Sequence, residues 1–168
     1  MTTKRSLNKL SMTVLILLTR LIVAAAIASS IRVEFENLSV PITYSIQNDC
    51  NLDASTVMND PQGSALKSGL IQATTITANK ILFQYPLTVQ IDNIIDTTAN
   101  CPQGQHCLLV VSTIHTVVMP GGDDADTLED KLVEGIKESF EDGSFFSSLP
   151  QDAVDCPLGI GLEIGYGK

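Results

Sequence analysis

The stretch Leu38-Ser-Val-Pro-Ile-Thr-Tyr-Ser-Ile-Gln47 places an apolar side chain at every second position. This period of two is typical of a β-strand with one buried and one exposed face. Residues Ile31 to Glu36 alternate in the opposite phase, so we expect a bulge or turn near Asn37. Pro41 is an objection to a central position for this strand, because proline cannot donate a ladder hydrogen bond; a bulge that extends to it would weaken the objection.

The rest of the chain alternates between helical and extended patterns. Apolar residues at helical spacing predict one helix from about Ser64 to Leu82. They predict a second that starts with the capping sequence Thr127-Leu-Glu-Asp130 and stops at Gly143. A polar loop, Thr97 to His106, joins two strands into a hairpin. Three further strands are expected: Tyr85 to Asp96, Leu108 to Met119 and the final strand, Leu158 to Tyr166.

The order of these elements is β-α-β-β-α-β. This is the split βαβ, or ferredoxin-like, pattern, in which an antiparallel four-stranded sheet carries two helices on one face. The chain has 168 residues, which suits one domain. We therefore predict a single α+β domain over residues 31–168, with its first and last strands adjacent.

The first 30 residues have the features of an export segment. Basic residues precede an apolar run from Met12 to Ile31, and Ala26 and Ala28 are the small residues typical of a cleavage site. The run also has the length of a membrane-spanning helix, although Arg20 lies in its middle at an energetic cost. A cleaved signal peptide, an uncleaved signal-anchor and a buried soluble helix all remain open.

The first two alternatives agree about where the domain lies. The basic residues that precede the apolar run stay on the cytoplasmic side by the positive-inside rule, and they are Lys4, Arg5 and Lys9. Residues from about Ile31 onward would then lie outside the cytoplasm. We expect either secretion or a single-pass membrane protein with its C-terminus outside.

Four cysteines fit an oxidising compartment. They are Cys50, Cys101, Cys107 and Cys156, and an even number outside the leader favours two disulfides over a zinc site. In the predicted topology all four fall at one end of the sheet. Of the three possible connectivities we predict Cys50–Cys156 and Cys101–Cys107.

This order of elements in an extracytoplasmic setting resembles the SEA-domain group of extracellular modules, over about residues 38–167. The resemblance implies a ferredoxin-like fold outside the cell. SEA modules often cleave themselves at a Gly-Ser-apolar turn between their second and third strands. The corresponding loop here, Asn100 to Cys107, lacks that step, and the sequence Gly143-Ser-Phe-Phe146 lies after the second helix instead.

Composition and motifs narrow the possible chemistry. Acidic residues outnumber basic ones 19 to 10, for a net charge of −9, which argues against nucleic-acid binding. No nucleophile elbow, phosphate loop or zinc-protease motif is present. His115 is the candidate base if the chain is a secreted hydrolase. Asp123, Asp124 and Asp126 are weak candidates for Ca²⁺ ligands. Helix capping and a solvated acidic helix explain them better, and we expect no cofactor.

Two further features concern surfaces. Asn37-Leu-Ser39 is an N-glycosylation sequon on an extracytoplasmic segment, so a eukaryotic source would make the chain a glycoprotein. In the final strand Gly159, Gly161 and Gly165 share one side. Bare strand faces and sheet edges invite docking, so we expect a non-catalytic interaction or structural module that binds another extracellular protein or a second copy of itself.

Overall fold

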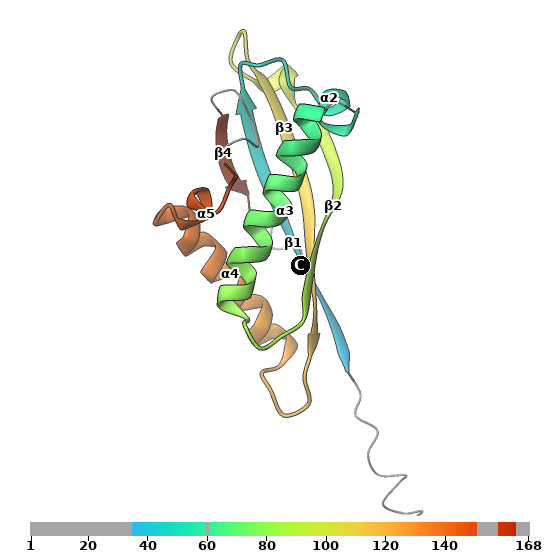
Figure 1. Cartoon of the computed structure of the whole chain (residues 1–168), viewed down its shortest axis with the longest axis vertical. Coiled ribbons are helices and arrows are strands. Elements are labelled where there is room, and N and C mark those ends of the chain that lie inside the picture. The colour runs from blue at the N-terminus through green and yellow to red at the C-terminus, as the bar shows by residue number, and fades with distance from the viewer. Residues whose placement is uncertain (1–34, 60, 151–157, 164–168) are drawn as a thin grey trace, which may run out of the picture. The chain divides into compact units, whose positions relative to one another are not determined.

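A computed structural model describes residues 35–59, 61–150 and 158–163 of the chain. They belong to a compact unit that begins at Phe35. In chain order the elements are β1 (Glu36–Asn48), α2 (Ala54–Asn59), α3 (Pro61–Ile81), β2 (Leu87–Asp96), the 3-10 helix η1 (Thr98–Asn100), β3 (His106–Val118), α4 (Ala125–Glu141), α5 (Ser144–Ser147) and β4 (Leu158–Glu163) (Figure 1).

The four strands form one sheet in the order β2-β3-β1-β4. Each neighbouring pair is antiparallel. These observations confirm the predicted α+β class, the antiparallel four-stranded sheet and the adjacency of the first and last strands. The predicted leader, residues 1–30, lies outside the described residues. Within the described part, no helix is both long enough and apolar enough to cross a membrane.

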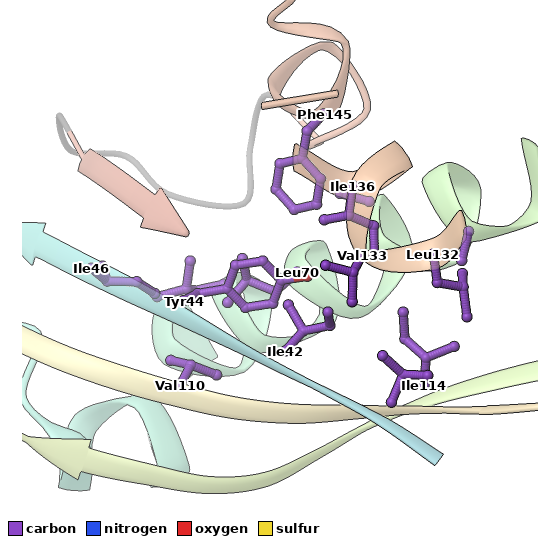
Figure 2. Packing of buried hydrophobic residues seen from close by; sticks show 14 of the residues in the cluster. Ile42, Tyr44, Ile46, Leu70, Val110, Ile114, Leu132, Val133, Ile136 and Phe145 are labelled. Atoms are coloured by element: carbon purple, nitrogen blue, oxygen red, sulfur yellow. The ribbon is translucent and has the colours of Figure 1, made fainter. Parts of the chain in front are cut away.

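The core lies between the sheet and the helices. The even-numbered residues of β1 from Leu38 to Ile46 are all buried, as the period of two requires. Figure 2 shows Ile42, Tyr44 and Ile46 of this strand pointing toward side chains of α3, α4 and α5. Leu70, Leu132 and Ile136 are among the helical residues that have 0% exposure. Among the described residues, the helices therefore cover one face of the sheet, and no described helix lies on the other.

Tyr44 places a polar group inside this core. Its hydroxyl lies 2.6 Å from Thr74 Oγ1, and the Thr74 hydroxyl donates to the carbonyl of Leu70, also at 2.6 Å. Since that proton goes to Leu70, Tyr44 is the donor in the first bond. Burial raises the pKa of Tyr44 to about 12, against the opposing effect of hydrogen bonds with Thr74 and Ser112.

The bulge predicted near Asn37 is not found. β1 pairs with β3 without a break from Glu36 to Asn48. The register shift instead falls in β2, between Ile91 and Asn93. Pro41 therefore lies in a regular central strand, opposite Thr113. A bulge does not explain how proline is accommodated at this position.

The direction of the backbone groups gives that explanation. The Thr97 N–H donates to the Cys107 carbonyl at 2.8 Å, so odd-numbered residues of β3 direct their backbone groups toward β2. By the same alternation, odd-numbered residues of β1 direct theirs away from β3 and toward β4. The described β1–β4 pairing ends at Thr43. The missing N–H of Pro41 thus lies beyond that pairing and removes no hydrogen bond between β1 and β3.

Two helix starts also differ from expectation. The short helix α2 was not predicted; Asp53 begins it by accepting from the backbone N–H of Thr56 at 2.7 Å. The N-cap of α4 is Asp124, which accepts from the backbone N–H of Thr127 at 2.8 Å. Thr127 is therefore the donor to the cap and not the cap itself. Gly143 follows α4 with φ of 77°, which fits its predicted role as the stop.

Candidate interaction surface

The helix-free face of the sheet, called the outer face below, carries the candidate site. Its side chains come from positions that alternate with the buried ones. Most are small or neutral, and all are exposed or half-buried. From β1, β3 and β4 they include Ser39, Thr43, Ser45, Gln47, Leu109, Val111, Thr113, His115, Gly159 and Gly161.

An open groove of about 540 Å³ runs over one end of this face. Two of the predicted interface glycines lie in it: Gly161 pairs with Ser45 and Gly159 with Gln47. A Cβ added to Gly161 would meet Ser45 Oγ, and one added to Gly159 would make ordinary contact with Gln47 Cβ at 3.7 Å. The backbone of β4 is consequently uncovered here. We call this hollow the glycine groove; its remaining lining residues are Ile46, Thr97, Asn100, Cys107, Leu108, Leu109 and Ile160.

The disulfide loop between β2 and β3 closes one side of the glycine groove. Cys101 and Cys107 are bonded, as predicted. The backbone N–H of Cys107 also donates to Thr98 Oγ1 at 3.3 Å. From the neighbouring strand the Gln47 amide donates to the side chain of Gln105. The disulfide and the bond to Thr98 hold the loop to the start of β3, and the Gln47–Gln105 bond joins it to β1.

The second predicted disulfide involves the end of β1. Cys50 is half-buried beside the core, and no described cysteine is free. Its predicted partner, Cys156, lies outside the described residues, as does the third interface glycine, Gly165. The pairing Cys50–Cys156 therefore stays a prediction.

His115 lies at the other end of the outer face. Its Nδ1 is 2.9 Å from the hydroxyl of Ser39, its cross-strand neighbour on β1. Both side chains line a second hollow of about 470 Å³, together with the exposed Asn37 and with Thr88 of β2. The structure thus brings the candidate base and the sequon onto one face.

The acidic residues around the start of α4 have separate structural roles. The hydrogen bond from Thr127 holds the pKa of the Asp124 carboxyl below its usual range. Asp123 forms a 2.6 Å ion pair with Lys131, whose pKa is raised by that hydrogen bond. Asp126 lies exposed in the first turn of the helix. Among the described residues, no group of three His, Cys, Asp or Glu side chains is placed to hold a metal ion.

The sequence predicted the glycines but missed two features of this surface. One is the set of polar groups around them: Thr97 and Asn100, whose only signal was a polar loop next to the cysteines, and Gln47, an outward-facing residue of the first strand. The other is the pairing of Ser39 with His115. Each residue is on the outward phase of its strand, but the register that joins them is set by the whole sheet.

Comparison of the chain with models of known protein families gives no match, and comparison with curated protein sequences gives none either.

Proposed function

We propose that the chain is a non-catalytic extracytoplasmic interaction module, and that it binds another extracellular protein through the glycine groove. In this proposal the domain is ferredoxin-like and similar to SEA modules, and it is either secreted or tethered by residues 12–31. The observation that carries the proposal is the glycine groove itself, where Gly159 and Gly161 have no side chains to cover the strand backbone, on a face that none of the described helices covers.

The chemistry of the groove favours a protein partner. Its walls combine neutral polar side chains from Ser45, Gln47 and Asn100 with the half-buried apolar side chain of Leu109. Such a mixture can supply hydrogen bonds and apolar contact to a polypeptide. The groove also borders β4, and in the described sheet no strand pairs with the outer edge of β4.

The location outside the cytoplasm has its own support. Disulfides such as Cys101–Cys107 persist in oxidising compartments and are rare in the cytosol. The excess of acidic residues, 19 against 10 basic ones, is consistent with a soluble acidic surface.

A lysine placed in the groove tests this function. Gly161→Lys requires the Ser45 hydroxyl to rotate, whereas Gly159→Lys meets only ordinary contacts. Both are expected to fold and to abolish crosslinking of the chain to its partner in extracellular fractions. Thr88→Lys, an exposed outer-face position outside the groove, is the matched control and should crosslink as the wild type does.

Two results would count against the groove. One is that both glycine variants crosslink as well as the control. The other is that wild type and variants are monomeric at high concentration and crosslink to nothing. If light scattering instead shows a dimer that Gly159→Lys dissociates, the partner is a second copy of the chain.

A secreted hydrolase is the second candidate, favoured by the 2.9 Å contact between Ser39 and His115. In such an enzyme His115 would accept the proton of Ser39 as the serine oxygen attacks an ester carbonyl carbon. It would then give that proton to the departing alcohol as the ester C–O bond breaks, and water would hydrolyse the resulting acyl-serine. A fluorophosphonate probe tests this directly, because it labels activated serines. Labelling of Ser39 that is lost in His115→Ala, which keeps the sequon intact, would support the hydrolase; an unlabelled wild type would eliminate it.

A further inference from the structure

Three large apolar side chains are exposed at the end of the domain where β1 begins. Phe35 is 62% exposed, Phe83 is 77% exposed and Met119 is 37% exposed. Exposed side chains of this size that gather at one place mark a surface that contacts something. We call these three residues the apolar tip.

The register and the loops bring the apolar tip together. Glu36 pairs with Val118. Phe35 precedes Glu36 and Met119 follows Val118, so both residues lie at the same end of the β1–β3 pair. Phe83 lies in the loop after α3, and Tyr85 of that loop accepts a hydrogen bond from the backbone N–H of Asp123 at 3.3 Å. Figure 1 shows the end of α3, the start of β1 and the loop before α4 at the same end, opposite α2.

The sequence places the apolar segment very close to this tip. The apolar run ends at Ile31, four residues before Phe35. Four fully extended residues span at most about 14 Å. The polar interface of a bilayer is roughly 5–8 Å thick on each side of the hydrocarbon. If the run from Met12 to Ile31 spans a membrane, the domain has no room to move far from the lipid headgroups.

We propose that the chain remains anchored by Met12 to Ile31 and that the apolar tip rests in the interface of the outer leaflet. This inference takes the tethered form of the function proposed above. The side chains would enter a lipid surface without net charge, because the same end carries the acidic residues Glu36, Asp124 and Asp126. Phenylalanine at this depth loses contact with water without burying a charge.

A single tryptophan reports the depth of the tip. The chain contains no tryptophan, so Phe83→Trp in the full chain provides the only indole signal. The variant is reconstituted in phosphatidylcholine vesicles with or without bromine on the acyl chains, which quenches nearby tryptophan. Met58→Trp is the matched control: Met58 is 60% exposed and lies on α2, at the opposite end.

The expected result is that Phe83→Trp floats with the vesicles and is quenched at least about twofold more than Met58→Trp. Phe35→Trp should behave like Phe83→Trp. Equal quenching at the two ends would overturn contact of the tip, and a chain that does not float with vesicles would overturn the anchor. Neither result affects the glycine groove, which is tested by Gly159→Lys at the other end of the sheet.

Discussion

The two faces of β1 share one backbone and differ in their burial and in the side chains that they carry. Ile42 and Tyr44, which face the helices, have 0% exposure, while Ser45 is half-buried and Gln47 is exposed on the outer face. The helix-covered face therefore supplies burial, which stabilises the fold. The outer face contributes little burial and is free to carry a binding surface. Substitutions on neighbouring residues of one strand should consequently have unrelated effects.

The largest contrast is expected between adjacent residues. Ile42→Ala leaves a cavity under α3 and α4 and should lower the free energy of unfolding by about 2–5 kcal/mol. Thr43→Ala, one residue along on the outer face, should lower it by less than about 1 kcal/mol. Urea unfolding of both variants measures the difference. Similar losses of unfolding free energy in the two variants would mean that the two faces contribute equally to stability.

Alkaline pH should act on the helix-covered face through Tyr44. The folded-state pKa of about 12 lies above the ordinary tyrosine value of 10.0, so the stabilisation is complete below pH 10 and is lost as pH rises toward 12. Two pKa units correspond to about 3 kcal/mol. Tyr44→Phe should lack most of this alkaline loss. A wild type whose unfolding free energy is unchanged between pH 10 and pH 12 would contradict the raised pKa of Tyr44.

The disulfide next to the glycine groove should matter less for stability than for binding. Removing Cys101–Cys107 by a double substitution to alanine frees a loop of about seven residues, which the chain-entropy model values at about 2 kcal/mol. The wall of the groove would lose its covalent link, so partner binding should weaken as well. Calorimetry together with the crosslinking assay separates these effects. Full binding by the double variant would show that the wall needs no disulfide.

The smallest effect is expected from carboxylates that lie on neither face. Hydrogen bonds from nearby residues lower the pKa of four aspartates, namely the half-buried Asp53 and the exposed Asp96, Asp124 and Asp142. Their stabilisation is present above the unfolded pKa near 4 and is lost as pH falls through the lower folded values. The unfolding temperature should decrease below about pH 4. Asp124→Asn, which keeps a capping oxygen, should show a smaller decrease.

The difference between the two faces could largely be predicted from the sequence, because the alternation of apolar and polar residues shows which face of a strand is buried. The strands, both long helices and the bare side of β4 follow from periods of two and 3.6. The N-cap of α4 was placed at Thr127 instead of Asp124 because both types of residue can cap a helix. The choice between them depends on where the backbone turns.

Other features depend on distant parts of the chain. The helix α2 has only six residues, too few for an apolar period to emerge. It is stabilised by packing of Val57, which is 1% exposed. The bulge between Ile91 and Asn93 and the contact of Ser39 with His115 arise from strand register, which no single segment encodes. The walls of the glycine groove likewise come from distant parts of the chain that the strand register brings together.

Pro41 has a consequence for how β4 finds its place. The sequence of β4, Leu158-Gly-Ile-Gly-Leu-Glu163, repeats every two residues, so a slide of two residues along β1 would keep each side chain on its proper face. Such a slide in one direction would bring Glu163 opposite Pro41, whose backbone has no hydrogen to donate. The misaligned ladder would form one bond fewer than the native one. A single proline thus disfavours the slide of a repetitive last strand in one of the two directions along its partner.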